Sequence, residues 1–397
     1  MKKILILLCF LLALYQTCYA QRDRKSVLSE EVSEVLRPII LEKTHWAMMQ
    51  VPVTVTATSC ERSAGGLHDF YSEGDYWWPN PDDPNGPYIQ RDGQTNPENF
   101  TAHRQAMIRF SQVVGTLASA YILTGDESYV KHAVTHLKAW FINPETRMNP
   151  SLLYAQAIQG RVTGRGIGII DMIQMMEVAQ GVLVMEKAKE FSPEDFHQIQ
   201  QWFEKYLIWV TTHPYGVSER EALNNHGTCW AMQVAVFARL TRNQALLDYC
   251  RERFKKVLLP TQLATDGSFP LETKRTKPYG YSLFNLDAMT TLCHVLSTPA
   301  ASLWDFTLSD GRTLRKAVDF LYPYVADKAK WPFGEDVMYW DNWPVAHPFL
   351  LFAYAKYGRT PWLESWKKLD HNPQTEEVIR NLPIRNPLLW THVSVVN

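Results

Sequence analysis

Apolar residues recur at helical spacing along most of the chain. Between residues 29 and 49, Val32, Val35, Leu36 and Ile39 follow the i, i+3, i+4, i+7 pattern of a helix with one apolar face. From residue 100 onward the same spacing returns almost without interruption, whereas strand signals are sparse. The pattern therefore predicts an all-α protein whose first helix covers 29–49.

The predicted helices follow one another as pairs. Three segments, 121–130, 237–247 and 354–363, share one design, in which a helix ends, a few polar residues turn the chain and the next helix begins. Such recurrence is typical of stacked helical hairpins. The predicted hairpins pair 100–124 with 127–141, 165–189 with 193–213, 225–240 with 243–259, 281–297 with 313–326, and 345–357 with 361–369. This favours an (α/α)n toroid of about six to seven helical hairpins, complete or incomplete, over a bundle.

A long segment between the first helix and the hairpins lacks helical periodicity. It covers about 52–99, is rich in Gly, Pro, Asp and aromatic residues, and begins with a candidate strand at 51–58 that we expect to be peripheral. Loops of this length are uncommon inside compact domains and are usually functional or disordered. Because the segment holds many aromatic residues, Phe70 and Tyr88 among them, we predict an ordered loop that lines a cleft.

The first twenty residues have the organisation of a signal peptide. Lys2 and Lys3 precede a purely apolar run, and small residues stand before a plausible cleavage point at Gln21. The run is too short to span a bilayer. We therefore expect 1–20 to be removed and 21–397 to form a single toroid domain that is exported to the periplasm or the medium, with no membrane span.

The charge, cysteine and histidine content limits which ligands, disulfides and metals can be expected. The formal net charge of −1 argues against a general nucleic-acid or membrane surface, so affinity for a polyanion must come from a local cluster of Arg and Lys. Four cysteines remain after cleavage, at positions 60, 229, 250 and 293, without a CxxC spacing. We predict buried free thiols, with a disulfide as the alternative that export permits. His132 and His136 share a helix face without a third ligand nearby, so neither a metal nor another cofactor is expected.

Two segments combine a polar start with an apolar continuation. In LNNHGTCWAMQVAVFARL (223–240), Asn224 suits a helix cap, whereas Asn225 and His226 exceed what a cap needs. In RTKPYGYSLFNLDAM (275–289), a guanidinium and two phenols precede an apolar run. An amide, an imidazole, a guanidinium and phenols together suit proton abstraction next to a carboxylate.

Three strings carry a resemblance to a known family. HDFYSEGDYWWPNPDDPNGPYIQRDGQ (68–94), LNNHGTCW (223–230) and KRTKPYGYSLFNLDAM (274–289) resemble the alginate lyase family of α/α-toroid polysaccharide lyases, and the similarity extends over most of the mature chain. The resemblance implies β-elimination on a uronic-acid polymer, so the expected partner is an acidic polysaccharide, with alginate as the first expectation. Glucuronan is the closest competing substrate, because it presents the same C5 proton and carboxylate.

The resemblance also implies which residues act. The family's catalytic Asn and His correspond to Asn225 and His226, its Arg to Arg275 and its Tyr to Tyr281. Tyr279 is the alternative for the tyrosine, but the Ser-Leu-Phe after Tyr281 keeps the family's spacing. As substrate-binding residues we expect Tyr71, Tyr76, Trp77, Trp78, Arg91, Gln156, Arg161, Arg165, Lys274, Lys277 and Tyr279.

Proton abstraction at C5 of a uronate makes specific demands on these groups. It adds charge beside a carboxylate, which Asn225 with Arg275 or His226 would neutralise. Where the C5 proton and the C4 oxygen share one face of the ring, one tyrosine can serve as base and acid; where they are opposed, His226 can be the base and Tyr281 the acid. A phenol titrates near pH ~10, so we expect the cationic neighbours Arg275, Lys274 and Lys277 to lower the pKa of Tyr281.

Two other classes of protein remain open from the residues alone. A glycoside hydrolase on the same toroid would need two opposed carboxylates, and the candidates are Asp75, Asp266, Glu272, Glu335 and Asp336. A non-catalytic glycan-binding protein would need only aromatic and basic walls. Preference for mannuronate or guluronate, endo or exo action and the oligomeric state do not follow from the sequence.

Overall fold

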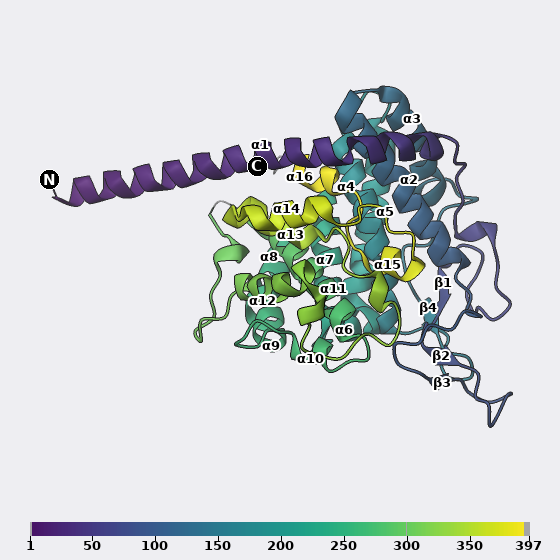
Figure 1. The fold of residues 1–397 in the computed structure, drawn as a ribbon. Coiled ribbons are helices and arrows are strands. Elements are labelled where there is room, and N and C mark those ends of the chain that lie inside the picture. Colours follow the sequence, from purple (N-terminus) through teal and green to yellow (C-terminus); the bar gives the residue numbers. More distant parts are fainter. Residues whose placement is uncertain (1, 299, 393–397) are drawn as a thin grey trace.

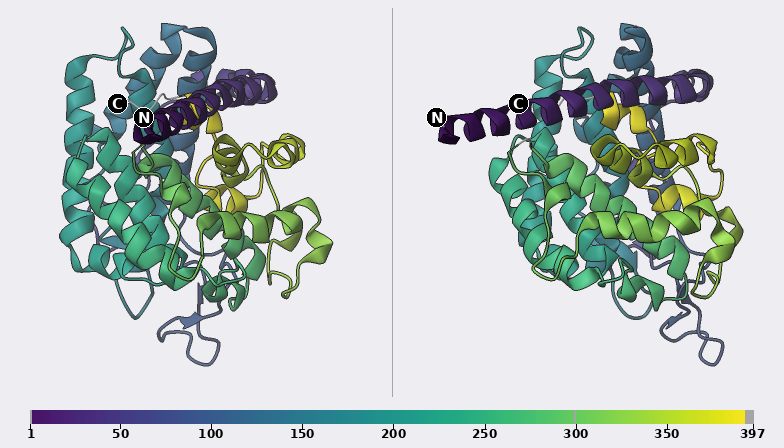
Figure 2. Two further views of the ribbon diagram at one scale, coloured as in Figure 1. Left: turned by 90° about the vertical axis from the view of Figure 1, so that its left-hand side faces the viewer. Right: turned by 60° about the vertical axis from the view of Figure 1, so that its left-hand side comes forward.

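A long N-terminal helix and a set of packed helix pairs make up the fold (Figure 1). The computed structural model describes residues 2–298 and 300–392, without the side chains of 2–23 and 25. Helix α1 (Lys2–Met48) projects beyond the helical body at its N-terminal end, and its remainder lies along that body (Figures 1 and 2). The predicted helix 29–49 is part of α1. The predicted signal peptide falls on Met1, which lies outside the described residues, and on the stretch of α1 without described side chains.

The helices after α1 include the other predicted ones in chain order, together with short helices at 214–220, 259–262, 270–273, 376–381 and 387–392 that were not predicted from the sequence. They are α2 (Ala102–Thr124), α3 (Glu127–Phe141), α4 (Met175–Met185), α5 (Pro193–Thr212), α6 (Pro214–Arg220), α7 (Asn225–Leu240), α8 (Gln244–Arg253), α9 (Leu259–Gln262), α10 (Pro270–Thr273), α11 (Pro278–Leu296), α12 (Leu314–Ala326), α13 (Pro348–Tyr357), α14 (Thr360–Lys368), α15 (Glu376–Asn381) and α16 (Pro387–His392). The first half of the predicted helix 165–189 is instead a 3₁₀ helix, Gly166–Gln174, and a π-helical turn, Phe254–Leu258, joins α8 to α9.

Local sequence explains where several helices begin and end. The side chain of Ser192 accepts a hydrogen bond from the backbone N–H of Asp195 and caps α5, whose first residue is Pro193. Gly125 and Gly358 close α2 and α13 with φ angles of 71° and 69°. Glycine adopts this left-handed conformation without a steric penalty, so these two positions end their helices.

Six helices form a closed ring around the core. The order is α1, α2, α4, α7, α11 and α13, with each helix packed on the next and α13 packed back on α1. Helices α3, α8, α12 and α14 lie against their ring partners α2, α7, α11 and α13. The predicted α/α toroid is confirmed, and α1 is the helix that closes it. The predicted pairing of α4 with α5 is wrong, because α5 packs mainly on α3, α6 and α7.

The segment 52–99 is ordered and holds short strands. β1 (Tyr71–Glu73) pairs in parallel with β4 (Tyr154–Ala157), and β2 (Trp77–Trp78) pairs antiparallel with β3 (Ile89–Gln90). The β2–β3 hairpin projects from the helical body (Figure 1).

The predicted strand at 51–58 is wrong. A 3₁₀ turn, Val55–Ala57, occupies it, and the Thr54 side chain accepts the backbone N–H of Thr56. The Thr54 hydroxyl donates to the carbonyl of Thr146, so local side-chain hydrogen bonds replace a strand partner.

Two of the most apolar helical segments are buried in the core. Helix α2 and the segment Gly166–Met185 are long and apolar enough to span a membrane, but 72% and 78% of their apolar windows lie inside the protein. They are therefore core helices. Cys229, Cys250 and Cys293 are buried and Cys60 is partly exposed, and all four are free thiols. The prediction of free thiols is confirmed for these four residues, though not the burial of Cys60.

Candidate active site

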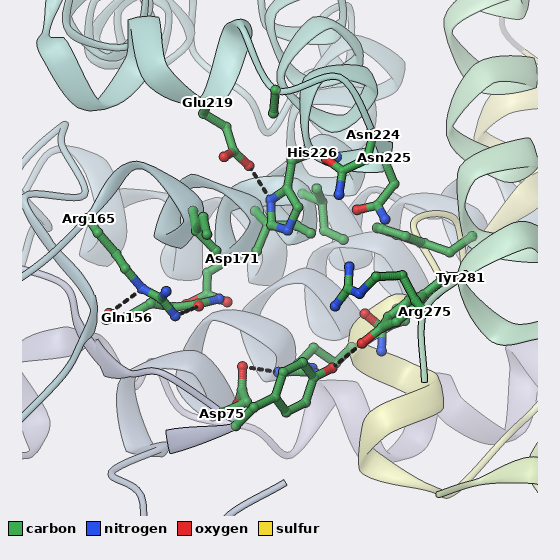
Figure 3. A pocket seen from close by; sticks show the side chains of 18 of the residues that line it. Asp75, Gln156, Arg165, Asp171, Glu219, Asn224, Asn225, His226, Arg275 and Tyr281 are labelled. Carbon is green, nitrogen blue, oxygen red and sulfur yellow. Dashed lines mark hydrogen bonds and ion pairs between the residues drawn. The ribbon is translucent and has the colours of Figure 1, made fainter. Parts of the chain in front are cut away.

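A cavity of about 580 Å³ opens between the aromatic loop and the starts of helices α7 and α11 (Figure 3). Six parts of the chain contribute to it: the segment around β2 and β3, the first turn of α2, the stretch from β4 to α4, the α6–α7 turn, the segment that leads into α11 with the start of that helix, and α15. Its wall includes Asp75, Tyr76, Trp77, Asp92, Arg104, Gln156, Arg165, Asp171, Glu219, Asn224, Asn225, His226, Arg275, Tyr281 and Arg380. All four residues predicted as catalytic therefore line one cavity.

Asn225 is held at the first turn of α7 by a buried carboxylate. Glu272 accepts the backbone N–H of Asn225 at 2.7 Å and its side-chain Nδ2 at 2.7 Å. The Asn224 side chain accepts the backbone N–H of His226 and caps the helix, as predicted. Since Glu272 takes one hydrogen of the amide Nδ2, the second hydrogen is available toward the cavity.

His226 has a carboxylate on its far side. Its Nδ1 lies 2.6 Å from Oε1 of Glu219, and the second ring nitrogen is directed into the cavity (Figure 3). Burial alone would lower the pKa of His226, but the negative charge and hydrogen bond of Glu219 outweigh burial and raise that pKa above its usual value. His226 is thus a stronger base than an isolated histidine.

Arg275 and Tyr281 lie together on the opposite wall. The guanidinium carbon is 4.6 Å from the centre of the Tyr281 ring, and Nη2 donates to Oδ1 of Asp92 at 2.8 Å. The hydroxyls of Tyr281 and Tyr76 are 2.9 Å apart and hydrogen-bonded.

The expectation that cations lower the pKa of Tyr281 is wrong for this cavity. Burial and Tyr76 raise the pKa well above its usual value, although Arg275 acts in the opposite direction. Lys274 is exposed outside the cavity, whereas the Nζ of buried Lys277 lies 5.3 Å from the centre of the Tyr281 ring but is paired with Glu377. Tyr281 is therefore a protonated phenol here.

At the start of α11, Tyr281 lines the cavity and Tyr279 does not. The backbone N–H groups of Tyr279 and Gly280 donate to the carboxylate of Asp336, which anchors the helix end. Two residues are separated by roughly 200° around a helix, so the two tyrosines face opposite ways. Tyr279 is fully buried, and its hydroxyl donates to the carbonyl of Tyr324 at 2.9 Å. The alternative tyrosine therefore has no access to the cavity.

Four of the predicted substrate-binding residues line the cavity: Tyr76, Trp77, Gln156 and Arg165. Arg165 donates from Nε to the carbonyl of Gln156 and from Nη2 to its side-chain oxygen, both at 3.0 Å. Its guanidinium also lies 5.8 Å from the centre of the Trp77 ring. These three residues form a wall that combines a cation, an amide and an aromatic face.

The other predicted substrate-binding residues do not line the cavity. They are Tyr71, Trp78, Arg91, Arg161, Lys274, Lys277 and Tyr279. Tyr71 is buried and donates to Glu73 at 2.9 Å. Trp78 follows Trp77 on β2, and successive strand residues face opposite sides, so Trp78 contacts the exposed Arg91 instead. Exposed Arg161 lies over the Trp77 ring and donates to the carbonyl of Tyr88.

A buried ion network supports the floor of the cavity. Arg104 donates to Asp75 at 2.6 Å and its Nε lies 3.2 Å from Asp171. Arg380 of α15 pairs with Asp75 and with Glu377. Burial would raise the pKa of Asp75, but Arg104 and Arg380 lower it to about 2. Sequence reasoning missed both arginines, because isolated charges in helical segments carry no signal of their partners.

The network and its neighbours occupy most of the carboxylates considered for a glycoside hydrolase. Asp75 stays ionised and cannot act as a general acid. Glu272 holds Asn225, Asp336 anchors α11 and Asp266 accepts from Ser268. Glu335 is exposed and does not line the cavity.

In the part of the chain that the structure describes, no three His, Cys, Asp or Glu side chains are grouped so that they could hold a metal ion. His132 and His136 contact each other with ring centres 5.1 Å apart, and both lie near the carbonyl of Gln50. Burial and His132 lower the pKa of His136 to about 4. These two histidines pack at the α1–α3 contact, away from the cavity.

Comparison with known proteins agrees with this geometry. Residues 54–331 match the family model described as alginate lyase. A solved alginate lyase from Bacteroides ovatus is 30% identical, with a TM-score of 0.79 over 93% of this chain and 97% of that one. Alginate lyase A1-III complexed with a tetrasaccharide is 12% identical, with a TM-score of 0.58 over 93% of both chains. A1-III from Sphingomonas species A1 has 12% identity and a TM-score of 0.53 over 88% and 93% of the two chains. No curated protein matches the chain significantly.

The fold, the cavity and these matches define a polysaccharide lyase built on an α/α toroid. The hydrolase and the non-catalytic glycan-binding alternatives are therefore wrong. The chain belongs to the alginate lyase family.

Proposed function

We propose that the protein is an exported enzyme that cleaves alginate by β-elimination through Asn225, His226, Arg275 and Tyr281. The observation that carries the proposal is the shared cavity: an amide, an imidazole, a guanidinium and a phenol from α7 and from the region that begins α11 face one space. The family relationship supports the reaction type. The tetrasaccharide complex of A1-III supports an oligosaccharide as the ligand of this cavity.

Asn225 and Arg275 neutralise the substrate carboxylate. Glu272 takes one hydrogen of the Asn225 amide, and Asp92 takes Nε and Nη2 of Arg275, which leaves an amide N–H and Nη1 for the substrate. Donors held in place before the substrate arrives cost no reorganisation when charge develops at C5. Removing such a donor typically lowers the rate by ~10²–10³.

Tyr281 and His226 transfer protons. Where the C5 proton and the C4 oxygen share one face of the sugar, Tyr281 must first release its own proton, and it then removes the C5 proton and returns one to the leaving oxygen. Where they are opposed, His226 removes the C5 proton and Tyr281 protonates the leaving oxygen. The raised pKa values of both residues suit this second case, because His226 is a stronger base and Tyr281 keeps its proton.

The environment of Arg165 favours a polymeric substrate, because this arginine is free to bind a second carboxylate next to the one at the reacting sugar. Among the cavity arginines that the structure describes, Arg165 differs from Arg104, Arg275 and Arg380 in having no carboxylate within ion-pair distance. A cation paired only with neutral groups is available for an anionic ligand. A polyuronate offers a carboxylate on every residue.

We expect Arg165→Gln to raise KM for alginate roughly tenfold or more, with a smaller effect on kcat, because a charge-assisted hydrogen bond contributes about 1.5–3 kcal/mol. Arg161→Gln is the matched control, since Arg161 also lies over the Trp77 ring but outside the cavity. Steady-state kinetics on both variants check this. Equal KM values for Arg165→Gln and Arg161→Gln would remove Arg165 from substrate binding.

The test of the function is an absorbance assay over a panel of polyuronates. β-Elimination creates an unsaturated sugar that absorbs in the near ultraviolet. We expect alginate to give this product, and glucuronan is the competing substrate in the panel. Release of reducing ends without new absorbance would refute a lyase.

Export is the remaining part of the proposal. It is supported by Lys2, Lys3 and the apolar run after them. Expression of the full chain in a bacterial host should give a periplasmic or secreted protein that begins at Gln21. N-terminal sequencing of that protein checks it, and an uncleaved cytoplasmic chain would contradict export.

A further inference from the structure

Glu219 is a buried carboxylate whose position the four proposed catalytic residues do not explain. It lies near the end of α6 on the cavity wall, and 1% of its side chain is exposed. Among the described residues its ion-pair partner is His226, at 2.6 Å. A buried carboxylate costs free energy unless it is compensated, so this placement requires a strong interaction with His226.

The contact decides which nitrogen of His226 carries a proton. An ionised carboxylate only accepts hydrogen bonds, so Nδ1 of His226 must be the donor. The neutral ring then has its lone pair on Nε2, which faces the cavity (Figure 3). The other charged groups that act on the ring are Glu272 and Arg275. Glu272 is engaged with Asn225 and Arg275 with Asp92, so Glu219 is the group bonded directly to the ring.

We propose that Glu219 is a positioning residue that makes His226 the base for uronates whose C5 proton and C4 oxygen lie on opposite faces of the ring. This rests on the proposed function and names a substrate for it. Mannuronate and guluronate differ in configuration at C5, and guluronate is the one with the opposed arrangement. Glu219 would thereby extend the enzyme from mannuronate to guluronate residues.

Each proton and electron pair in this step has a destination. Nε2 of His226 takes the C5 proton, and the electrons of that C–H bond form the C4–C5 double bond. The C4–O bond breaks, and the Tyr281 hydroxyl donates its proton to the leaving oxygen. Glu219 stabilises the imidazolium that forms, as a carboxylate does behind a catalytic histidine. Solvent then returns a proton to Tyr281 and removes one from His226.

The pH dependence distinguishes this role from a structural one. His226 must be neutral to act as a base, so the rate on guluronate falls as the pH drops below the pKa of His226. Glu219 raises that pKa, so Glu219→Gln should move the acidic limb of the guluronate profile to lower pH. Glutamine keeps the size and one hydrogen-bond acceptor, and loses the charge.

The experiment compares Glu219→Gln with wild type on guluronate-rich and mannuronate-rich oligomers. We expect kcat on guluronate to fall about 10²-fold, within the range for general acid–base groups. On mannuronate, where Tyr281 serves as base and acid, we expect a loss below about tenfold. Glu221→Gln is the matched control, because exposed Glu221 pairs with Arg220 and Arg253 and does not line the cavity. It should behave as wild type.

Three results would overturn the inference: equal losses on the two oligomers, an unmoved acidic limb, or a wild-type enzyme without turnover on guluronate. A wild-type enzyme that cleaves no polyuronate would instead refute the proposed function. Thermal unfolding of Glu219→Gln shows whether the fold is retained. If the glutamine variant unfolds, Glu219→Asp, which keeps the charge, should retain the acidic limb of wild type; a displaced limb in Glu219→Asp would also overturn the inference.

Discussion

Replacing Tyr281 by phenylalanine is expected to lower kcat on alginate by about 10²–10⁴-fold, the range that a general acid or base contributes. The hydroxyl is the group that would protonate the leaving oxygen, and phenylalanine has no proton to donate. The ring that packs under Arg275 remains, so substrate binding and the melting temperature should change little. Single-turnover kinetics and thermal unfolding on one preparation measure both quantities.

The matched control for Tyr281→Phe is Tyr279→Phe. Tyr279 is buried outside the cavity, and its hydroxyl donates to the carbonyl of Tyr324. Losing that hydrogen bond leaves a buried acceptor and should cost about 1–3 kcal/mol of stability, with kcat unchanged. Near-normal turnover in Tyr281→Phe would remove this tyrosine from the mechanism.

Replacing Arg104 by methionine is expected to lower the free energy of unfolding by about 3–5 kcal/mol. Arg104 lies between Asp75 and Asp171, and its side chain is 3% exposed. Methionine fills much of the volume and leaves both carboxylates with one cation fewer, and breaking a buried ion pair in this way has a cost of that size. Because Asp75 precedes Tyr76, activity should fall with the stability.

The Arg104 variant should also alter how stability depends on pH. The folded-state pKa of Asp75 is about 2, below the value of ~3.9 for an unfolded chain, so its ion pairs stabilise the protein above pH ~4 and lose their effect as the pH falls toward 2. That loss should be smaller in Arg104→Met. Urea unfolding at pH 7 and at a pH of about 2, on either side of the window set by the two pKa values, measures it. Arg109→Met, on the same helix and bonded to the neutral Gln50, is the control and should cost about 1 kcal/mol. A similar cost for both variants would show that the ion network contributes little.

The helical part of the fold could be predicted because its signals are local. Apolar periodicity, the Ser192 cap and the glycines at 125 and 358 lie within the elements they define. The packing partners of α5 could not be predicted in this way, because two helices that follow each other in the chain can each pack on other helices, as α4 and α5 do. The strand at 51–58 was wrong for a related reason, because a β pattern needs a partner that no local signal provides.

Some features of the candidate site could likewise be predicted from local sequence, and others could not. By itself the sequence determined the helix starts that carry Asn225, His226 and Tyr281, because a cap, a proline and the spacing of polar and apolar residues act within one turn of a helix. Only the tertiary structure decided which charges are paired, that Glu219 stands behind His226 and Arg380 behind Asp75, and that burial raises the pKa of Tyr281. Ion pairing and desolvation depend on distances between segments far apart in the chain, and those distances exist only once the ring has closed.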